Sequence, residues 1–191
     1  MNIKNLIQDS IQTKERLLEN DSIIKNIELV TNKVAESFTN NGQVLFCGNG
    51  GSAADAQHLA AEFSGRFYFD RAPLNAEALH VNTSYLTAVG NDYSFDDIYS
   101  RIIKAKGKEG DILFGISTSG NSKNIINALI QAKKQGLFTI GLSGETGGKM
   151  KEHCDILINI PSTDTPRIQE CHILVGHIIC QLVEEQLFKK S

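Results

Sequence analysis

Two residues with metal-binding side chains follow a glycine-rich loop in the first third of the sequence. His58 and Glu62 are four positions apart, which places both on one face of a helix. Imidazole nitrogen and carboxylate oxygen bind divalent transition metals, and a carboxylate can also transfer a proton in general acid–base catalysis. The spacing equally allows an exposed polar pair on a helix flank, so the two residues are candidates for a metal site.

The glycine loop lies directly before this helix. The apolar run of residues 44–47 is typical of a buried parallel strand, and the sequence GNGG (48–51) follows it. We expect Ser52 to cap the helix that begins there. A strand, a glycine turn and a helix start direct unpaired N–H groups and the positive end of the helix dipole at one point, which favours phosphate binding.

A dinucleotide site is the main alternative for this loop. Gly48-x-Gly50-x-x-Ala53 matches the fingerprint G-x-G-x-x-G/A, and Asp70 lies roughly 20 residues further on, as the fingerprint requires. Asp70 follows an aromatic run (67–69), however, which is unlike the end of a second parallel strand. Because no lysine follows the glycines, the loop is not a Walker P-loop.

A second polar loop has a similar layout. Residues 111–116 (DILFGI) are predicted to form a strand, and the sequence STSGNS (117–122) follows it before another helical pattern. Hydroxyl groups beside backbone N–H groups bind a phosphate without an arginine clamp, which suits a small phosphorylated sugar. Such residues also form ordinary turns and caps. The loop 117–122 follows a buried strand and has the same layout as residues 44–64, which favours phosphate binding.

The remaining elements alternate between strands and helices. An apolar face (Ile3, Ile7, Ile11) and an apolar stripe on residues 23–38, capped by residues 21–22, predict two helices before the first strand. Further strands are predicted at 76–81, 111–116, 138–142 and 156–160. Further helices are predicted at 85–104, from the second loop to 136, and at 167–188. The first of these helices follows a cap at 83–84 and is broken around 90–92. This order predicts an α/β three-layer sandwich with a five-stranded parallel sheet. We expect a single domain over 1–191 with an N-terminal helical extension (about 1–41).

Composition and charge narrow the function classes. A net charge of −3, without a long basic cluster, argues against a nucleic-acid partner. No apolar run approaches membrane-spanning length, and the first residues lack the apolar region of a signal peptide. The four cysteines show no C-x-x-C spacing, which favours reduced thiols. We therefore expect a cytoplasmic protein without a membrane partner.

The motifs in combination resemble a known family. CGNGGSA with H-x-x-x-E, then GND, then GISTSGNS, then RIQE with HI-x-x-QL, are similar in order to those of the phosphoheptose isomerases, which have the sugar-isomerase (SIS) fold. The resemblance covers essentially the whole chain. It implies an aldose–ketose isomerase that converts sedoheptulose 7-phosphate to D-glycero-D-manno-heptose 7-phosphate through an enediol. This reaction is the first step of ADP-heptose biosynthesis for lipopolysaccharide or capsule.

The same resemblance implies a homotetramer with one zinc ion per subunit and a set of site residues. The implied zinc ligands are His58, Glu62, Gln169 and His177. Glu62 would be the base and His177 the acid. The implied substrate contacts are Asn49, Gly50, Gly51, Ser52, Glu62, Asn91, Asp92, Ser117, Thr118, Ser119, Ser122 and Gln169. Gln169 and His177 are separated by about 12 Å along a straight helix, so both reach one ion only if Gln169 lies at a frayed helix start.

Two other function classes are compatible with such a fold. Related non-enzymatic binding proteins, one of which associates with the bacterial replication initiator, lack the residues at the positions of Glu62 and His177. A sugar-phosphate-sensing regulator would need an attached DNA-binding domain, for which this sequence has no room. Glu62 and His177 are both present here, which favours an enzyme over a binding protein. For the other histidines, His80, His153 and His172, we expect structural or surface roles. We expect the stripe of residues 23–38 and the final helix to pack between subunits.

Overall fold

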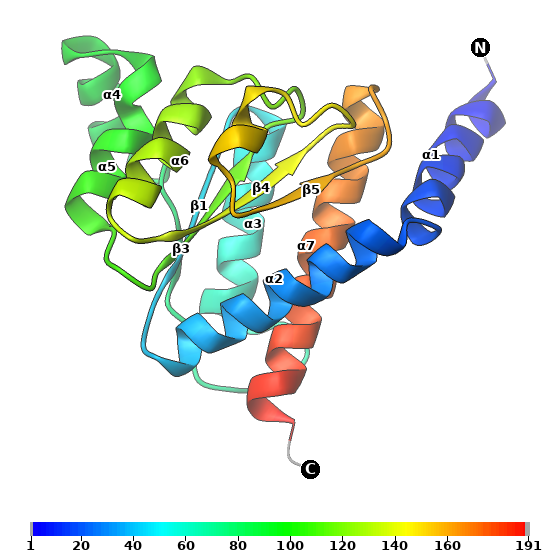
Figure 1. The fold of residues 1–191 in the computed structure, drawn as a ribbon, viewed down its shortest axis with the longest axis horizontal. Coiled ribbons are helices and arrows are strands. Elements are labelled where there is room, and N and C mark those ends of the chain that lie inside the picture. Colours follow the sequence, from blue (N-terminus) through cyan, green and yellow to red (C-terminus); the bar gives the residue numbers. More distant parts are fainter. Residues whose placement is uncertain (1, 190–191) are drawn as a thin grey trace.

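Parallel strands form the centre of the computed structural model, which describes residues 2–189 (Figure 1). Within these residues there are five strands, all parallel, in the order β2-β1-β3-β4-β5. Their bounds are β1 Val44–Gly48, β2 Ala76–Ala78, β3 Ile112–Ile116, β4 Phe138–Ser143 and β5 Ile156–Asn159. The predicted five-stranded parallel sheet is confirmed.

Helices cover both faces of this sheet and complete the three layers. One face carries α2 (Asp21–Thr39), α3 (Gly51–Ser64) and α7 (Thr165–Phe188), and α1 (Ile3–Leu18) contacts α7 and α2. The other face carries α4 (Thr83–Asp92), α5 (Ile98–Lys106) and α6 (Lys123–Lys134), with 3₁₀ turns at η1 (Phe95–Asp97) and η2 (Lys149–His153). Figure 1 shows the sheet between these two groups of helices.

The strands are apolar on both sides because each side packs on helices. Successive side chains of a strand point to opposite faces. Phe46 and Phe114, whose ring centroids are 4.9 Å apart, belong to the core under α3 and α7. Leu45 and Leu113 belong to the core under α5 and α6. The apolar runs that predicted these strands therefore reflect burial on two faces.

Some predicted element ends are wrong. The second strand stops at Ala78 rather than residue 81, since the chain turns there and Val81 is exposed. The last helix begins at Thr165 rather than residue 167, because Pro166 fits a first turn that needs no N–H donor. Ser52 does not cap α3: Gly50 occupies the N-cap position, and Ser52 is buried in the first turn.

Asparagine side chains, rather than the predicted residues, cap two further helices. The Asn20 side chain accepts a hydrogen bond from the N–H of Ile23 at the start of α2. The Asn82 side chain does the same for Tyr85 at the start of α4. The caps predicted at residues 21–22 and 83–84 each lie one position too late, because asparagine holds the extended conformation that an N-cap requires.

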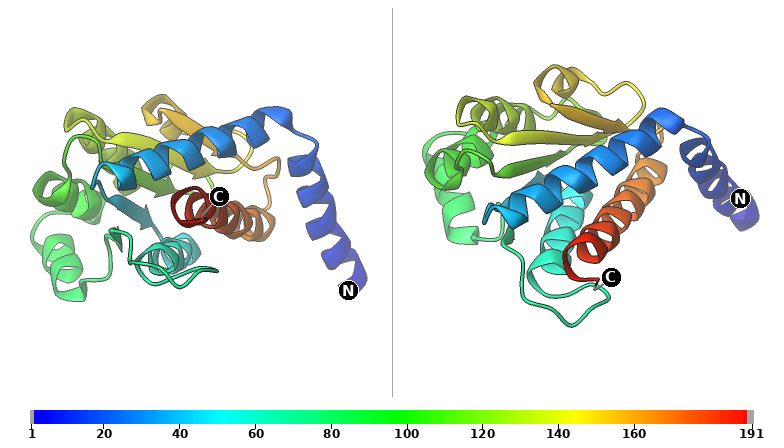
Figure 2. Two further views of the ribbon diagram at one scale, coloured as in Figure 1. Left: turned by 90° about the horizontal axis from the view of Figure 1, so that it is seen from below. Right: turned by 60° about the horizontal axis from the view of Figure 1, so that its bottom comes forward.

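The apolar stripe of α2 is covered within the chain. Ile23, Ile27, Val30 and Val34 are buried in the core that α2 shares with the sheet and α7. The prediction that this stripe packs between subunits is therefore wrong. The predicted apolar face of α1 is exposed instead, and α1 projects from the rest of the fold (Figure 2).

Hydrogen bonds attach α1 to the start of α7. Arg167 Nη1 donates to the carbonyl of Leu6 at 2.7 Å, and Ser10 Oγ donates to Glu170 Oε2 at 2.6 Å. These contacts hold the first half of α1 to α7 and leave its apolar face exposed. Among residues 2–189, no helix combines the length and apolar character needed to cross a membrane. The four cysteines are free thiols, as predicted.

Candidate active site

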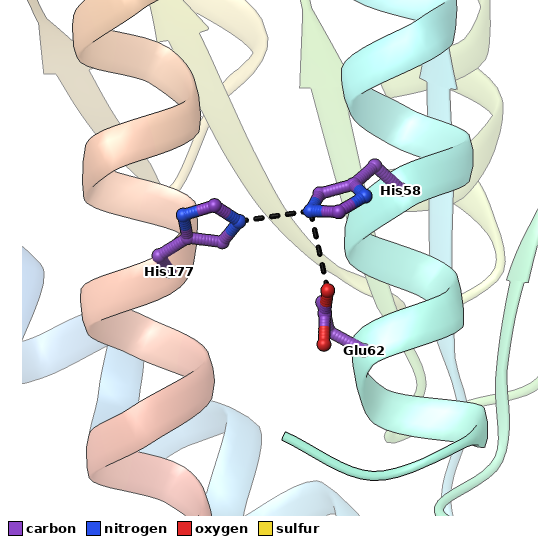
Figure 3. Close-up of side chains that lie close together, drawn as sticks. All are labelled: His58, Glu62 and His177. Carbon is purple, nitrogen blue, oxygen red and sulfur yellow. Dashed lines mark hydrogen bonds and ion pairs between the residues drawn. The ribbon is translucent and has the colours of Figure 1, made fainter. Parts of the chain in front are cut away.

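Three side chains from two neighbouring helices converge on one point (Figure 3). His58 and Glu62 extend from α3, and His177 extends toward them from α7. His58 Nε2 lies 2.9 Å from His177 Nε2 and 3.2 Å from Glu62 Oε1. One ligand atom from each residue lies within 4.8 Å of the other two. The helical spacing predicted the first pair, and the family resemblance implied His177. The structure brings His177 to His58 from 119 residues away.

This donor set fits a divalent metal ion. Two imidazole nitrogens and one carboxylate oxygen are ligands that transition metals such as zinc prefer, and three protein ligands leave a position for substrate. The side chain of His58 is about half exposed and that of Glu62 is 22% exposed, so small molecules can reach the three groups. We call His58, Glu62 and His177 the metal cluster.

A close approach of α3 and α7 makes this cluster possible. Gly176 on α7 faces Leu59 on α3, and a Cβ atom at Gly176 would lie 2.5 Å from Leu59 Cδ2. A larger residue at position 176 would therefore force the buried side chain of Leu59, or the two helices, to shift. His177 is the next residue along α7, so the absence of a side chain at Gly176 sets how near His177 comes to α3.

Asp55 is a neighbour of the cluster that sequence reasoning missed. It lies one turn before His58 on α3, and its Oδ2 atom is buried with no hydrogen-bond partner among the described residues. Burial raises the pKa of Asp55, and the charge of His58 opposes that rise. A carboxylate beside a metal-binding imidazole commonly orients the ring. The i, i+3 spacing to His58 was the available signal.

A pair of side-chain amides joins the glycine loop to α6, the helix that follows the second polar loop. Asn49 Nδ2 donates to Asn124 Oδ1 at 2.9 Å, and Asn124 Nδ2 donates to Asn49 Oδ1 at 2.8 Å. Asn124 lies in the first turn of α6, is buried, and was not predicted as a site residue. The predicted substrate role of the Asn49 side chain stays a prediction, since this pairing already engages its amide.

The second loop lines a cavity of about 290 Å³ rich in hydroxyl groups. Thr118 and Ser119 line it, together with residues 144–146 and the segment that leads into α7. Ser117 Oγ lies 3.1 Å from Ser122 Oγ, so these two hydroxyls are hydrogen-bonded to each other at the start of α6. The loop therefore has the donors expected of a phosphate site.

Strand order places the two loops side by side. They leave the carboxyl ends of β1 and β3, which are adjacent strands between which the strand order reverses. Ligands of open α/β sheets bind in the crevice at such a switch point. The metal cluster lies lower on α3: His58 is seven residues after Gly51, about 10 Å along the helix.

The structure brings Gln169 to the glycine loop. A Cβ atom at Gly51 would lie 2.4 Å from Gln169 Nε2, so the amide sits against the start of α3. Gln169 belongs to the regular part of α7, which begins at Thr165, and the helix start is not frayed there. Its position supports the predicted substrate contact, and its predicted metal ligation stays a prediction.

The predicted substrate contacts Asn91 and Asp92 bind each other in the structure, and their substrate role stays a prediction. They are exposed at the end of α4, and Asn91 Nδ2 donates to Asp92 Oδ1 at 2.9 Å. Within residues 2–189 no hydrogen bond links either to the other predicted site residues. Asp70 lies in a segment without a strand, so the context that a dinucleotide fingerprint requires is missing, and that alternative is wrong.

The other histidines differ from one another. His172 is buried, with Nε2 3.1 Å from the carbonyl oxygen of Ser143, and burial lowers its pKa to about 4. Its structural role agrees with the prediction. His80 is half-buried and lines a cavity of about 150 Å³ beside Asn49 and Gly50. Its Nδ1 atom has no partner among the described residues, and burial lowers its pKa.

The fold and the site together define a class of protein. The sheet order, the loops at the switch point and the metal cluster define an α/β domain suited to small phosphorylated ligands. Residues 7–144 match the SIS domain family model. The chain is 54% identical to the phosphoheptose isomerase of Aneurinibacillus thermoaerophilus, over 99% of this chain and 96% of that protein.

Solved structures agree with this match. The phosphoheptose isomerase of Neisseria gonorrhoeae superposes with a TM-score of 0.90 at 40% identity, covering 96% of this chain and 97% of that one. That of Francisella tularensis superposes with a TM-score of 0.92 at 34% identity, covering 96% of each chain. The chain therefore belongs to the SIS domain family and, within it, to the phosphoheptose isomerases.

Proposed function

We propose that this protein isomerises sedoheptulose 7-phosphate to D-glycero-D-manno-heptose 7-phosphate, the first step of ADP-heptose biosynthesis. The observation that carries the proposal is the convergence of His58, Glu62 and His177 in a chain that belongs to the phosphoheptose isomerases. The alternative, a non-enzymatic binding protein of the same fold, expects Glu62 and His177 to be replaced. The phosphoheptose isomerases to which the chain is similar do not support that alternative.

The chain's own residues account for the proton transfers. Hydroxyls of Ser117 and Ser119 and the nearby backbone N–H groups hold the phosphate. Glu62 removes a proton from C1 of the ketose and returns it to C2, with a 1,2-enediol between the two steps. His177 donates a proton to the oxygen on C2 and accepts one from the oxygen on C1, so that the carbonyl moves to C1 without net gain or loss of protons.

We propose zinc as the metal, with one ion per subunit. The donors of His58, Glu62 and His177 suit it. Gln169, the fourth predicted ligand, lies against Gly51 and would contact the substrate instead. When bound, zinc would act as a Lewis acid that polarises the substrate carbonyl. A carboxylate bound to a metal is a weaker base, so Glu62 would need to bind through one oxygen. We further propose that the enzyme acts in the cytoplasm.

Activity with and without metal tests the proposed function. Purified protein should convert sedoheptulose 7-phosphate, lose activity with a chelator and regain it with zinc. His58→Ala should lower zinc content and activity together while circular dichroism shows an unchanged fold. The matched control is His153→Ala, because that histidine lies outside the cluster. Full activity of metal-free wild-type protein would show that the cluster is not catalytic.

We propose that the assembly is a homotetramer of single SIS domains, each with an N-terminal helical extension (about 1–41). In support, Ile3, Ile7 and Ile11 form a row on α1 in which each residue is between 43% and 75% exposed. Such an apolar row on a projecting helix is typical of a subunit interface. Light scattering should find a tetramer for the wild type and smaller species for Ile7→Glu. A stable, active wild-type monomer would refute the tetramer.

A further inference from the structure

A buried ion pair lies near the metal cluster and has no part in the proposed proton transfers. Arg71, in the segment that follows α3, donates from Nε to Glu184 Oε1 on α7 at 2.8 Å. The side chains are 2% and 1% exposed, respectively. Buried charges are rare unless they are paired and fully hydrogen-bonded. The hydrogen bonds of this pair reach two helices and the segment between them.

The carboxylate of Glu184 binds the segment that follows α3. The backbone N–H groups of Phe67, Tyr68 and Phe69 donate to its two oxygens at 3.1, 2.6 and 3.0 Å. Burial alone would raise the pKa of Glu184, but these donors and Arg71 outweigh burial and lower it. Glu184 thus attaches residues 67–69 to α7 as an ionised group.

The guanidinium of Arg71 binds the carboxyl-terminal end of α3. It donates to the carbonyl of Glu62 at 2.9 Å, to that of Phe63 at 2.9 Å and to that of Gly65 at 3.2 Å. Carbonyls in the last turn of a helix lack partners within the helix, and a positive charge there is favourable. One of these carbonyls belongs to Glu62 itself, a member of the metal cluster.

The pair therefore connects the two helices that supply the metal cluster. Glu184 is seven residues after His177, which places both on one face of α7, about 10 Å apart. Phe67, which Glu184 binds through its backbone, has its ring centroid 5.7 Å from that of His177. Fixed contacts thus run from Glu62, through Arg71 and Glu184, to the helix that carries His177.

We propose that Arg71 and Glu184 are positioning residues that hold α3 and α7 at the relative placement in which the cluster binds one metal ion. This inference rests on the metal site of the proposed function. Packing alone could hold two helices together, and a buried ion pair often adds little stability over apolar side chains of similar size. The pair adds geometric specificity, because the planar guanidinium and the carboxylate fix both the position and the rotation of the segments that they bind.

Zinc affinity of folded variants tests the inference. Glu184→Gln keeps the shape but removes the charge, and Arg71→Lys keeps the charge but cannot reach three carbonyls and a carboxylate at once. Each should raise the zinc dissociation constant about 10- to 100-fold in competition with a chromogenic chelator, the range known for residues that support metal ligands. In the zinc-saturated variants kcat should fall while KM stays near the wild-type value.

Ile125→Val is the matched control. Ile125 is buried in the core on the other face of the sheet, so its truncation destabilises the fold without touching α3 or α7. It should leave zinc affinity unchanged. Folded Glu184→Gln or Arg71→Lys protein with wild-type affinity would overturn the inference. Failure of both variants to fold would also overturn it, by showing that the pair serves the fold. Wild-type protein that binds no zinc would instead refute the proposed function and its metal site.

Discussion

Replacing Gly51 with alanine should disable the site through a neighbouring side chain. The new Cβ atom would lie 2.4 Å from Nε2 and 3.0 Å from Cδ of Gln169, closer than non-bonded atoms approach. Because these atoms are the end of a flexible side chain, the amide should swing away and the backbone should stay in place. Gly51→Ala is thus expected to act as an indirect removal of Gln169 from the glycine loop.

Stability and activity should change in opposite directions in this variant. Gly51 is the first residue of α3 and does not have a positive φ, so alanine fits the helix and should stabilise the fold by up to about 0.4–1 kcal/mol. Loss of the hydrogen bond that Gln169 is predicted to make with the substrate should cost about 1–3 kcal/mol in the transition state, or about 5- to 150-fold in kcat/KM.

A double-mutant cycle separates this explanation from a general defect. Gln169→Ala should lower kcat/KM as much as Gly51→Ala does, and the double variant should lose little more. Gly90→Ala is the control, since a Cβ atom there meets nothing within 4 Å and Gly90 also lies in a helix. Losses that add in the double variant, or wild-type kinetics for Gly51→Ala, would refute the reasoning.

Three further predictions test the proton transfer, the phosphate site and a buried histidine. Glu62→Gln should lower kcat roughly 10²- to 10⁴-fold and stop deuterium uptake from D₂O into the sugar. Deuterium uptake at the wild-type rate in this variant would show that another residue is the base. Ser117→Ala and Ser119→Ala should each weaken phosphate binding by about 1–3 kcal/mol, seen mainly in KM, and unchanged kinetics of the double variant would exclude this loop as the phosphate site. Burial lowers the pKa of His172 from 6.5 in the unfolded chain to about 4 in the folded protein. Its contribution to the free energy of unfolding is therefore complete above pH 6.5 and is lost as pH falls toward 4. Urea unfolding should show that the free energy of unfolding falls by about 3 kcal/mol over this pH interval. His172→Gln should make the free energy of unfolding depend less steeply on pH, and an equally steep dependence would contradict the assignment to His172.

Local patterns in the sequence predicted most elements of the fold. Apolar runs such as residues 44–47 and 112–116 identify strands because both faces of this sheet are buried. The stripe Ile23, Ile27, Val30 identifies α2 because a helix buries one face. Element ends were less predictable. Whether Gly50 or Ser52 is the N-cap of α3 depends on the loop conformation, which contacts outside the helix select.

The assembly prediction shows where amphipathic patterns stop being informative. Both α1 and α2 have an apolar face, and the sequence alone does not say which face the sheet covers. The structure buries that of α2 against α7 and the strands and leaves Ile3, Ile7 and Ile11 on α1 exposed. A periodic pattern reports that a face is apolar, and packing decides what covers it.

The sequence by itself determined the local chemistry of the site. It placed His58 and Glu62 on one helix face, and it placed both polar loops directly after buried strands, because these relations follow from the repeat of a helix and the order of the chain. Only the tertiary structure decided which distant groups meet. The approach of α7 to α3 at Gly176 brings His177 to His58, the amide pair joins Asn49 to Asn124, and Arg71 meets Glu184 across 113 residues. Such contacts depend on the packing of whole helices against one sheet, which no local repeat in the sequence encodes.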